Sequence, residues 1–99
     1  MLQNIPINES SNNCKFFPGG CSPWDINGNR MTRYDLISVE KYLKDCILII
    51  GGNYDIDVEV VEYLKENDFE YLIKNRNESI EWYNKLVGQG RNVVILLHE

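Results

Sequence analysis

Polar and basic side chains stand directly after three apolar runs, which cover residues 46–50, 70–73 and 92–97. If the runs are parallel strands, their carboxyl ends meet at one edge of a sheet, where open α/β domains bind ligands. Lysine and arginine side chains and the free N–H groups of helices that begin there suit a phosphate or a carboxylate. The predicted ligand-binding residues are Gly51, Gly52, Asn53, Lys74, Arg76 and His98.

The two adjacent glycines do not make a dinucleotide-binding motif. The spaced third glycine is missing, and no lysine follows at the position that a phosphate-binding P-loop requires. Asp55 and Asp57 would also repel an anion that approached this loop. The alternative is that Gly51 and Gly52 only form the turn from a strand to a helix, which is a common use of glycine.

A metal or acid/base site is a second possibility at the same edge. Asp55, Asp57, His98 and Glu99 offer oxygen and imidazole ligands, and an imidazole changes its charge near neutral pH. The alternative is that the two aspartates cap and charge a helix start, while His98 lies too near the end of the sequence to be held firmly. We therefore predict no metal and no cofactor.

The cysteines match a structural zinc site only in number. Cys14, Cys21 and Cys46 with the single histidine would give four ligands, but six residues separate Cys14 from Cys21 instead of two to four. Cys46 opens an apolar run and is expected to be a small core residue. Free thiols in a reducing cytoplasm are the expected state.

An acidic helix face is the other candidate surface. Glu59, Glu62 and Glu66 share one face of an expected helix, and Glu62 repels Glu66 at i,i+4, so helix stability does not explain them. Such a face can dock on a basic protein, including a nucleic-acid-binding protein that it would occupy by charge mimicry. A virus-encoded inhibitor of a host nucleoprotein would fit, and a solvated face is the alternative.

Composition limits the classes of function. The net charge of −5 argues against direct binding of nucleic acid. No basic segment leads into an apolar run as in a secretory signal, and no apolar run is long enough to span a membrane. These features predict a cytoplasmic protein. Alanine is absent while asparagine and isoleucine are abundant, which indicates AT-rich coding and a low-GC bacterium or one of its viruses.

The regular part of the sequence alternates helices with strands. Helices are expected from Asp35 to Lys44, from Asp55 or Asp57 to Glu66, and from Asn77 to Gly88, around the three apolar runs. This βαβαβ order predicts a small three-stranded parallel sheet, a half-Rossmann unit, over 35–99. Residues 1–30 should be an irregular cover that includes Trp24, and the whole chain, 1–99, should form one domain.

Strand order is not encoded in this pattern. If the strands follow their order in the sequence, the second and third helices share one face of the sheet, and the first helix with the N-terminal aromatics covers the other. A sheet this small has open edges, which predicts a homodimer.

These observations predict a non-enzymatic binding or regulatory domain. It would act on a small anionic ligand, such as a nucleotide or phosphate, or on a basic protein through the acidic helix. The alternative is a small oligomeric enzyme that acts on a nucleotide or phosphate ester at the strand ends, with His98 as the candidate catalytic residue. An enzyme would lose its activity on His98→Ala or Lys74→Ala, whereas a protein-binding domain would lose its partner when the three glutamates are reversed in charge.

Overall fold

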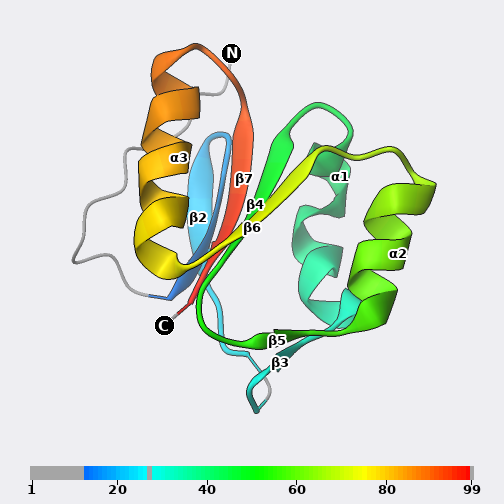
Figure 1. The fold of residues 1–99 in the computed structure, drawn as a ribbon. Coiled ribbons are helices and arrows are strands. Elements are labelled where there is room, and N and C mark those ends of the chain that lie inside the picture. Colours follow the sequence, from blue (N-terminus) through cyan, green and yellow to red (C-terminus); the bar gives the residue numbers. More distant parts are fainter. Residues whose placement is uncertain (1–12, 27, 99) are drawn as a thin grey trace.

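The computed structural model describes residues 13–26 and 28–98, which form a mixed five-stranded sheet with helices on both faces (Figure 1). The strand order is β2-β1-β7-β4-β6, and a short parallel pair, β3 and β5, lies beside it. The strands are β1 (Cys14–Phe17), β2 (Gly20–Pro23), β3 (Arg30–Met31), β4 (Ile47–Gly51), β5 (Asp55–Ile56), β6 (Tyr71–Lys74) and β7 (Val93–Leu97). The helices are η1 (Arg33–Val39, a 3₁₀ helix), α1 (Glu40–Leu43), α2 (Val58–Glu66) and α3 (Arg76–Gly88).

The predicted three-stranded parallel half-Rossmann sheet is wrong. Strands β4, β6 and β7 do pair in parallel, but an N-terminal hairpin of β1 and β2 extends the sheet by pairing antiparallel with β7. Part of the predicted irregular cover is therefore sheet, while residues 1–12 lie outside the described part. Pro18 and Gly19, which has a φ of 94°, form the hairpin turn with the proline-glycine order typical of type II turns.

The strand order also corrects the predicted placement of the helices. Strand β4 lies between β6 and β7, so the chain crosses the sheet in one direction through α2 and in the opposite direction through α3. Right-handed crossovers that run in opposite directions place their helices on opposite faces. Accordingly, α3 lies on one face of the sheet, and α1 and α2 lie on the other (Figure 1).

Alternating residues of the central strands fill two cores. Leu48, Ile50, Val94 and Leu96 point toward η1, α1 and α2, where they join the buried side chains of those helices. The intervening residues of β4 and β7 point toward α3, where they pack with Phe16 of β1. Burial on both faces explains why these two strands are continuous apolar runs.

Helix starts differ from prediction at two places. The expected helix from Asp35 to Lys44 is the 3₁₀ helix η1 followed by one turn of α1, and Thr32, not Asp35, precedes it as the cap. Asp35 is the third helical residue and accepts a hydrogen bond from the backbone N–H of Thr32 at 2.9 Å. Helix α3 begins at Arg76, one residue before the expected cap Asn77, because Asn75 caps it.

Candidate functional site

The carboxyl ends of β4, β6 and β7 meet at one edge of the sheet. Gly51 lies opposite Leu97 on one side and Lys74 on the other. The backbone N–H of His98 donates to the carbonyl of Gly51 at 2.9 Å, and the N–H of Gly52 donates to the carbonyl of Lys74 at 3.2 Å. These backbone groups extend the sheet, so they are not available to a ligand.

The two glycines are required by packing. A Cβ on Gly51 would overlap the side chain of Ser79, which is fully buried at the start of α3. Gly52 has a φ of 153°, and a Cβ there would overlap the ring of Tyr54 and the carbonyl of His98. Close approach of chain segments therefore accounts for both residues without a ligand.

His98 lies in an aromatic cluster at this edge. The centroid of its ring is 5.4 Å from that of Trp24 and 6.0 Å from that of Tyr54, both edge to face. The Trp24 and Tyr54 rings are 5.3 Å apart, also edge to face. Tyr54 donates its hydroxyl to the carbonyl of Leu96 at 3.3 Å, and burial raises the pKa of this phenol well above its usual range. The cluster fixes the loop after β4 against the end of β7.

A partly buried polar network, which the sequence pattern did not predict, continues from this cluster. The Nε1 of Trp24 donates to Oδ1 of Asp35 at 3.0 Å. Lys15 of β1 is only 8% exposed, and its Nζ donates to the carbonyl of Asp35 at 2.6 Å and to Oγ of Ser38 at 2.9 Å. Burial lowers the pKa of Lys15, an effect that the nearby charge of Asp35 opposes. The threonine-x-x-aspartate spacing of a capping box was the signal for the Asp35 contact.

An open groove of about 480 Å³ lies beside the start of α3 and contains two of the predicted ligand residues, Asn53 and Arg76. Its other lining residues are Asn75, Asn77, Glu78 and Glu81. Asn75 accepts from the backbone N–H of Glu78 at 2.8 Å and donates to the Glu78 carboxylate at 2.5 Å, so the helix start is already capped. Glu78 and Glu81, which both line the groove, would also repel an anion. The groove is large enough for a ligand, but its charges do not favour an anionic one.

No group of three or more histidine, cysteine, aspartate or glutamate residues that could hold a metal ion is found in residues 13–26 and 28–98. Asp57 caps α2 by accepting a hydrogen bond from the backbone N–H of Glu59 at 3.4 Å. Asp55 lies in the short strand β5, where it is the register partner of Arg30 in β3. Glu99 lies outside the described residues. All three cysteines are free thiols, and burial raises the pKa of Cys14 and Cys46, which keeps these two protonated.

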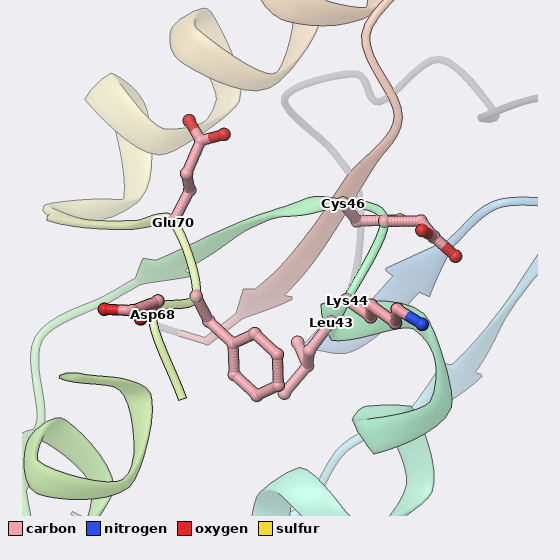
Figure 2. Close-up of a pocket in the computed structure, with 7 residues that line it drawn as sticks. Leu43, Lys44, Cys46, Asp68 and Glu70 are labelled. Carbon is pink, nitrogen blue, oxygen red and sulfur yellow. The ribbon is translucent and has the colours of Figure 1, made fainter. Parts of the chain in front are cut away.

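A smaller pocket of about 150 Å³ lies at the opposite end of the sheet, between the end of α1 and the start of β6. The charged ends of Lys44, Asp68 and Glu70 point in different directions, so no charged pair or clamp faces a common point (Figure 2). Its volume is below the range of about 300–1,000 Å³ that is typical of ligand sites.

The acidic face of α2 is exposed as expected. Glu59, Glu62 and Glu66 project away from the sheet, since Val60 and Leu64 on the opposite side of the helix are fully buried. The ion pairs seen in the described part of the chain are Arg33–Glu40 at 2.9 Å and Arg91–Glu70 at 3.3 Å, neither of which involves these glutamates.

The outer edge of β6 is a further exposed feature, which the sequence pattern did not predict. Within the described residues, β6 pairs only with β4 and crosses the front of Figure 1 between α3 and α2. The carbonyl of Glu70 accepts a hydrogen bond from the N–H of Leu48 in β4, and the carbonyl of Lys74 accepts one from Gly52, the residue directly after β4. Because successive residues of a strand direct their backbone groups to opposite sides, Tyr71 and Ile73 direct their N–H and C=O groups outward.

Apolar side chains accompany these outward backbone groups. Ile73 is 46% exposed, and Val58 at the start of α2 is 63% exposed. The guanidinium carbon of Arg33, the first residue of η1, lies 3.5 Å from the centroid of the Tyr63 ring on α2. Tyr63 therefore marks the flank of α2 that faces η1. Val58 and Val61 lie on the opposite flank by helical spacing, toward β6. We call Tyr71, Ile73, Val58 and Val61 the edge patch.

The sequence matches no family model and no curated protein. No helix in the described ranges is long and apolar enough to cross a membrane. The fold is similar to that of a crystal structure described as an outer membrane protein from Bartonella henselae, with a TM-score of 0.81 and 20% sequence identity. The match covers 97% of this chain and 95% of that one. At this identity, the likeness shows that the two chains share a fold.

Proposed function

We propose that this chain is a non-catalytic protein-binding domain that accepts an extended segment along the outer edge of β6. The observation that carries the proposal is the combination of outward backbone groups at Tyr71 and Ile73 with the exposed apolar side chain of Ile73. Proteins usually protect such an edge with proline, charged side chains, a bulge, a covering element or a short strand. The other edge strand, β2, ends in Pro23, whereas β6 contains no proline and its one charged residue, Lys74, stands at its end.

The geometry of the strand-end edge argues against the two other predicted functions. Gly51, Gly52 and the backbone N–H of His98 are engaged within the sheet, and Glu78 and Glu81 would oppose an anionic ligand in the adjoining groove. The His98 ring lies edge to face on Trp24 and Tyr54, a geometry that is typical of aromatic side chains that stabilise a fold. Neither arrangement supports a small-ligand site or an enzyme as well as the open edge supports protein binding.

Binding by strand addition can be tested with Ile73→Pro. The N–H of Ile73 points away from β4, so proline removes an outward donor without removing a bond within the sheet. Ile73→Val is the matched control because it keeps the donor and the branched side chain. A displayed library of random heptapeptides is selected on the wild-type domain, and the selected peptides are titrated against both variants by calorimetry.

The proposal predicts that selected peptides bind Ile73→Pro at least about tenfold more weakly than wild type, the equivalent of about 1.4 kcal/mol. Binding to Ile73→Val should stay within a few-fold of wild type. Peptides that bind Ile73→Pro as well as wild type, but lose affinity on Arg76→Glu, would instead identify the groove beside α3. Circular dichroism confirms that each variant is folded.

The acidic face of α2 is a second candidate protein-binding surface. It is favoured by one observation, that Glu59, Glu62 and Glu66 are exposed and have no ion-pair partner in the described residues. A triple charge reversal to lysine should abolish binding of basic peptides if this face is the site. If such peptides depend on Ile73 and not on the three glutamates, this candidate fails.

A further inference from the structure

We infer that the segment accepted by β6 is β6 of a second copy of this chain, antiparallel and with Leu72 opposite Leu72. The inference rests on the proposed function and specifies its partner. In this arrangement, Tyr71 of each copy faces Ile73 of the other, and the two sheets join into one continuous sheet. The exposed side chain of Ile73 would then pack against Tyr71 of the second copy.

The backbone selects this register. In an antiparallel pair, a hydrogen-bonded position needs two residues that both direct their N–H and C=O groups at the partner strand. In β6 these residues are Tyr71 and Ile73. Only a two-fold axis at Leu72 places Tyr71 of each copy opposite Ile73 of the other copy, which gives two hydrogen-bonded positions. An axis between Leu72 and Ile73 would place Tyr71 opposite Lys74, whose carbonyl is bonded to Gly52.

The charges at the two ends of the strand agree with the same register. Glu70 and Lys74 flank the centre at Leu72 symmetrically, so each glutamate comes to lie opposite a lysine of the other copy. Both residues are on the same side of β6 as Leu72, since side chains alternate along a strand. Opposite charges in facing positions stabilise a strand pair, and like charges destabilise it. A strand with this charge order is complementary to itself when it is reversed.

The flanking helix is also compatible with a second copy. The side of α2 that faces the edge of β6 carries Val58, Val61 and the exposed Lys65, which follows Val61 by one helical turn. Two copies related by the axis at Leu72 would therefore bring these valines and lysines of the two α2 helices toward each other. The edge patch thus continues the apolar contact beyond the strand.

The first test is sedimentation equilibrium of the wild-type chain over a wide range of concentrations, with Ile73→Pro and Ile73→Val. The wild type and Ile73→Val should dimerise, and Ile73→Pro should be monomeric. Glu70→Lys and Lys74→Glu should each raise the dimer dissociation constant several-fold by creating facing like charges. The double variant Glu70→Lys/Lys74→Glu should return toward the wild-type value, because the exchange restores two opposite-charge pairs.

The second test fixes the register by crosslinking and does not depend on proline. In a background with the three native cysteines replaced by serine, Leu72→Cys should form a disulfide-linked dimer under mild oxidation. Facing residues at a position without backbone hydrogen bonds are close enough for a disulfide. Ile73→Cys should not, because Tyr71 faces it. Crosslinking of Ile73→Cys but not Leu72→Cys would overturn the register.

A wild-type chain that stays monomeric at all concentrations overturns the inference. The proposed function would still stand if peptides bind that monomer in a manner that Ile73→Pro abolishes. If the chain dimerises but neither Ile73→Pro nor the charge variants weaken the dimer, the second copy binds elsewhere and the inference fails. If Ile73→Pro alters neither dimerisation nor peptide binding, both the inference and the proposed function fail.

Discussion

Gly51 on β4 and Ser79 on α3 lie so close that a Cβ on the glycine would overlap both Cβ and Oγ of the serine. The hydroxyl of Ser79 is buried and has no hydrogen-bond partner within residues 13–26 and 28–98, so the contact is one of shape and not of polar bonding. This contact sets how closely the first turn of α3 approaches the sheet, and therefore where the groove beside α3 begins.

Gly51→Ala is expected to destabilise the fold by about 1–3 kcal/mol, because the added methyl group must displace α3 from β4. Gly88→Ala is the matched control, since a Cβ on this helical glycine meets no atom within 4 Å. It should stabilise the fold by about 0.5–1 kcal/mol, as expected for replacing glycine in a helix. Urea unfolding of both variants measures the difference, and equal effects would contradict the close-packing explanation.

Lys15→Met is expected to change how stability depends on pH. The pKa of Lys15 in the fold is lower than its ordinary value of 10.5. As pH rises between the folded and the unfolded pKa, the unfolded chain holds more protons, so this group makes the wild type progressively more stable. The slope is at most about 1.4 kcal/mol per pH unit.

The difference in the free energy of unfolding, wild type minus Lys15→Met, should therefore increase from pH 7 toward pH 10. Taking the difference removes the contributions of tyrosines and cysteines that titrate in the same range. Urea unfolding with a reductant present at several pH values provides the measurement. A difference that is constant or falls with pH would show that Lys15 is not held in a desolvated site.

Asp35→Asn is expected to cost about 1–3 kcal/mol, because an amide cannot accept from both Trp24 Nε1 and the backbone N–H of Thr32. The exposed Asp45 gives a control, Asp45→Asn, with the same change in net charge. The indole N–H resonance of Trp24 in an NMR spectrum reports the bond directly. An unshifted indole resonance together with unchanged stability would contradict the contact.

His98→Ala should lower stability by about 0.5–1.5 kcal/mol, since it removes the ring that packs on Trp24 and Tyr54. The proposed function predicts that peptide binding at β6 is unchanged, because the ring lies beyond β7 and not at the β6 edge. Calorimetric titration with selected peptides tests this. Loss of binding with retained stability would make His98 part of the site.

Local sequence patterns were sufficient to locate the interior strands and two helices. Strands β4 and β7 are apolar because they are buried on both faces, and α2 and α3 carry apolar residues at helical spacing. The partner of β7 was not visible in this way. Strand β1 contains Lys15, which interrupts the apolar pattern although its side chain is buried, so the hairpin at residues 14–23 read as an irregular segment.

The candidate sites were predictable only in part. Parallel pairing predicts that Gly51, Lys74 and His98 meet at one edge, and the structure brings them together. The sequence could not show that Ser79 fills the space beside Gly51, because that contact depends on how α3 packs. Nor could it identify β6 as an edge strand, since the strand order is set by tertiary contacts between distant segments.

The central position of β7 has a consequence for biosynthesis. This strand lies between β1 and β4, yet it is the last of the described strands to leave the ribosome. Until it is made, the N-terminal hairpin has no neighbour in the sheet and the apolar surfaces of β4 stay partly uncovered. Long-range pairing of this kind slows folding and exposes aggregation-prone strands. A nascent chain of this protein thus depends on its final strand before the sheet can close.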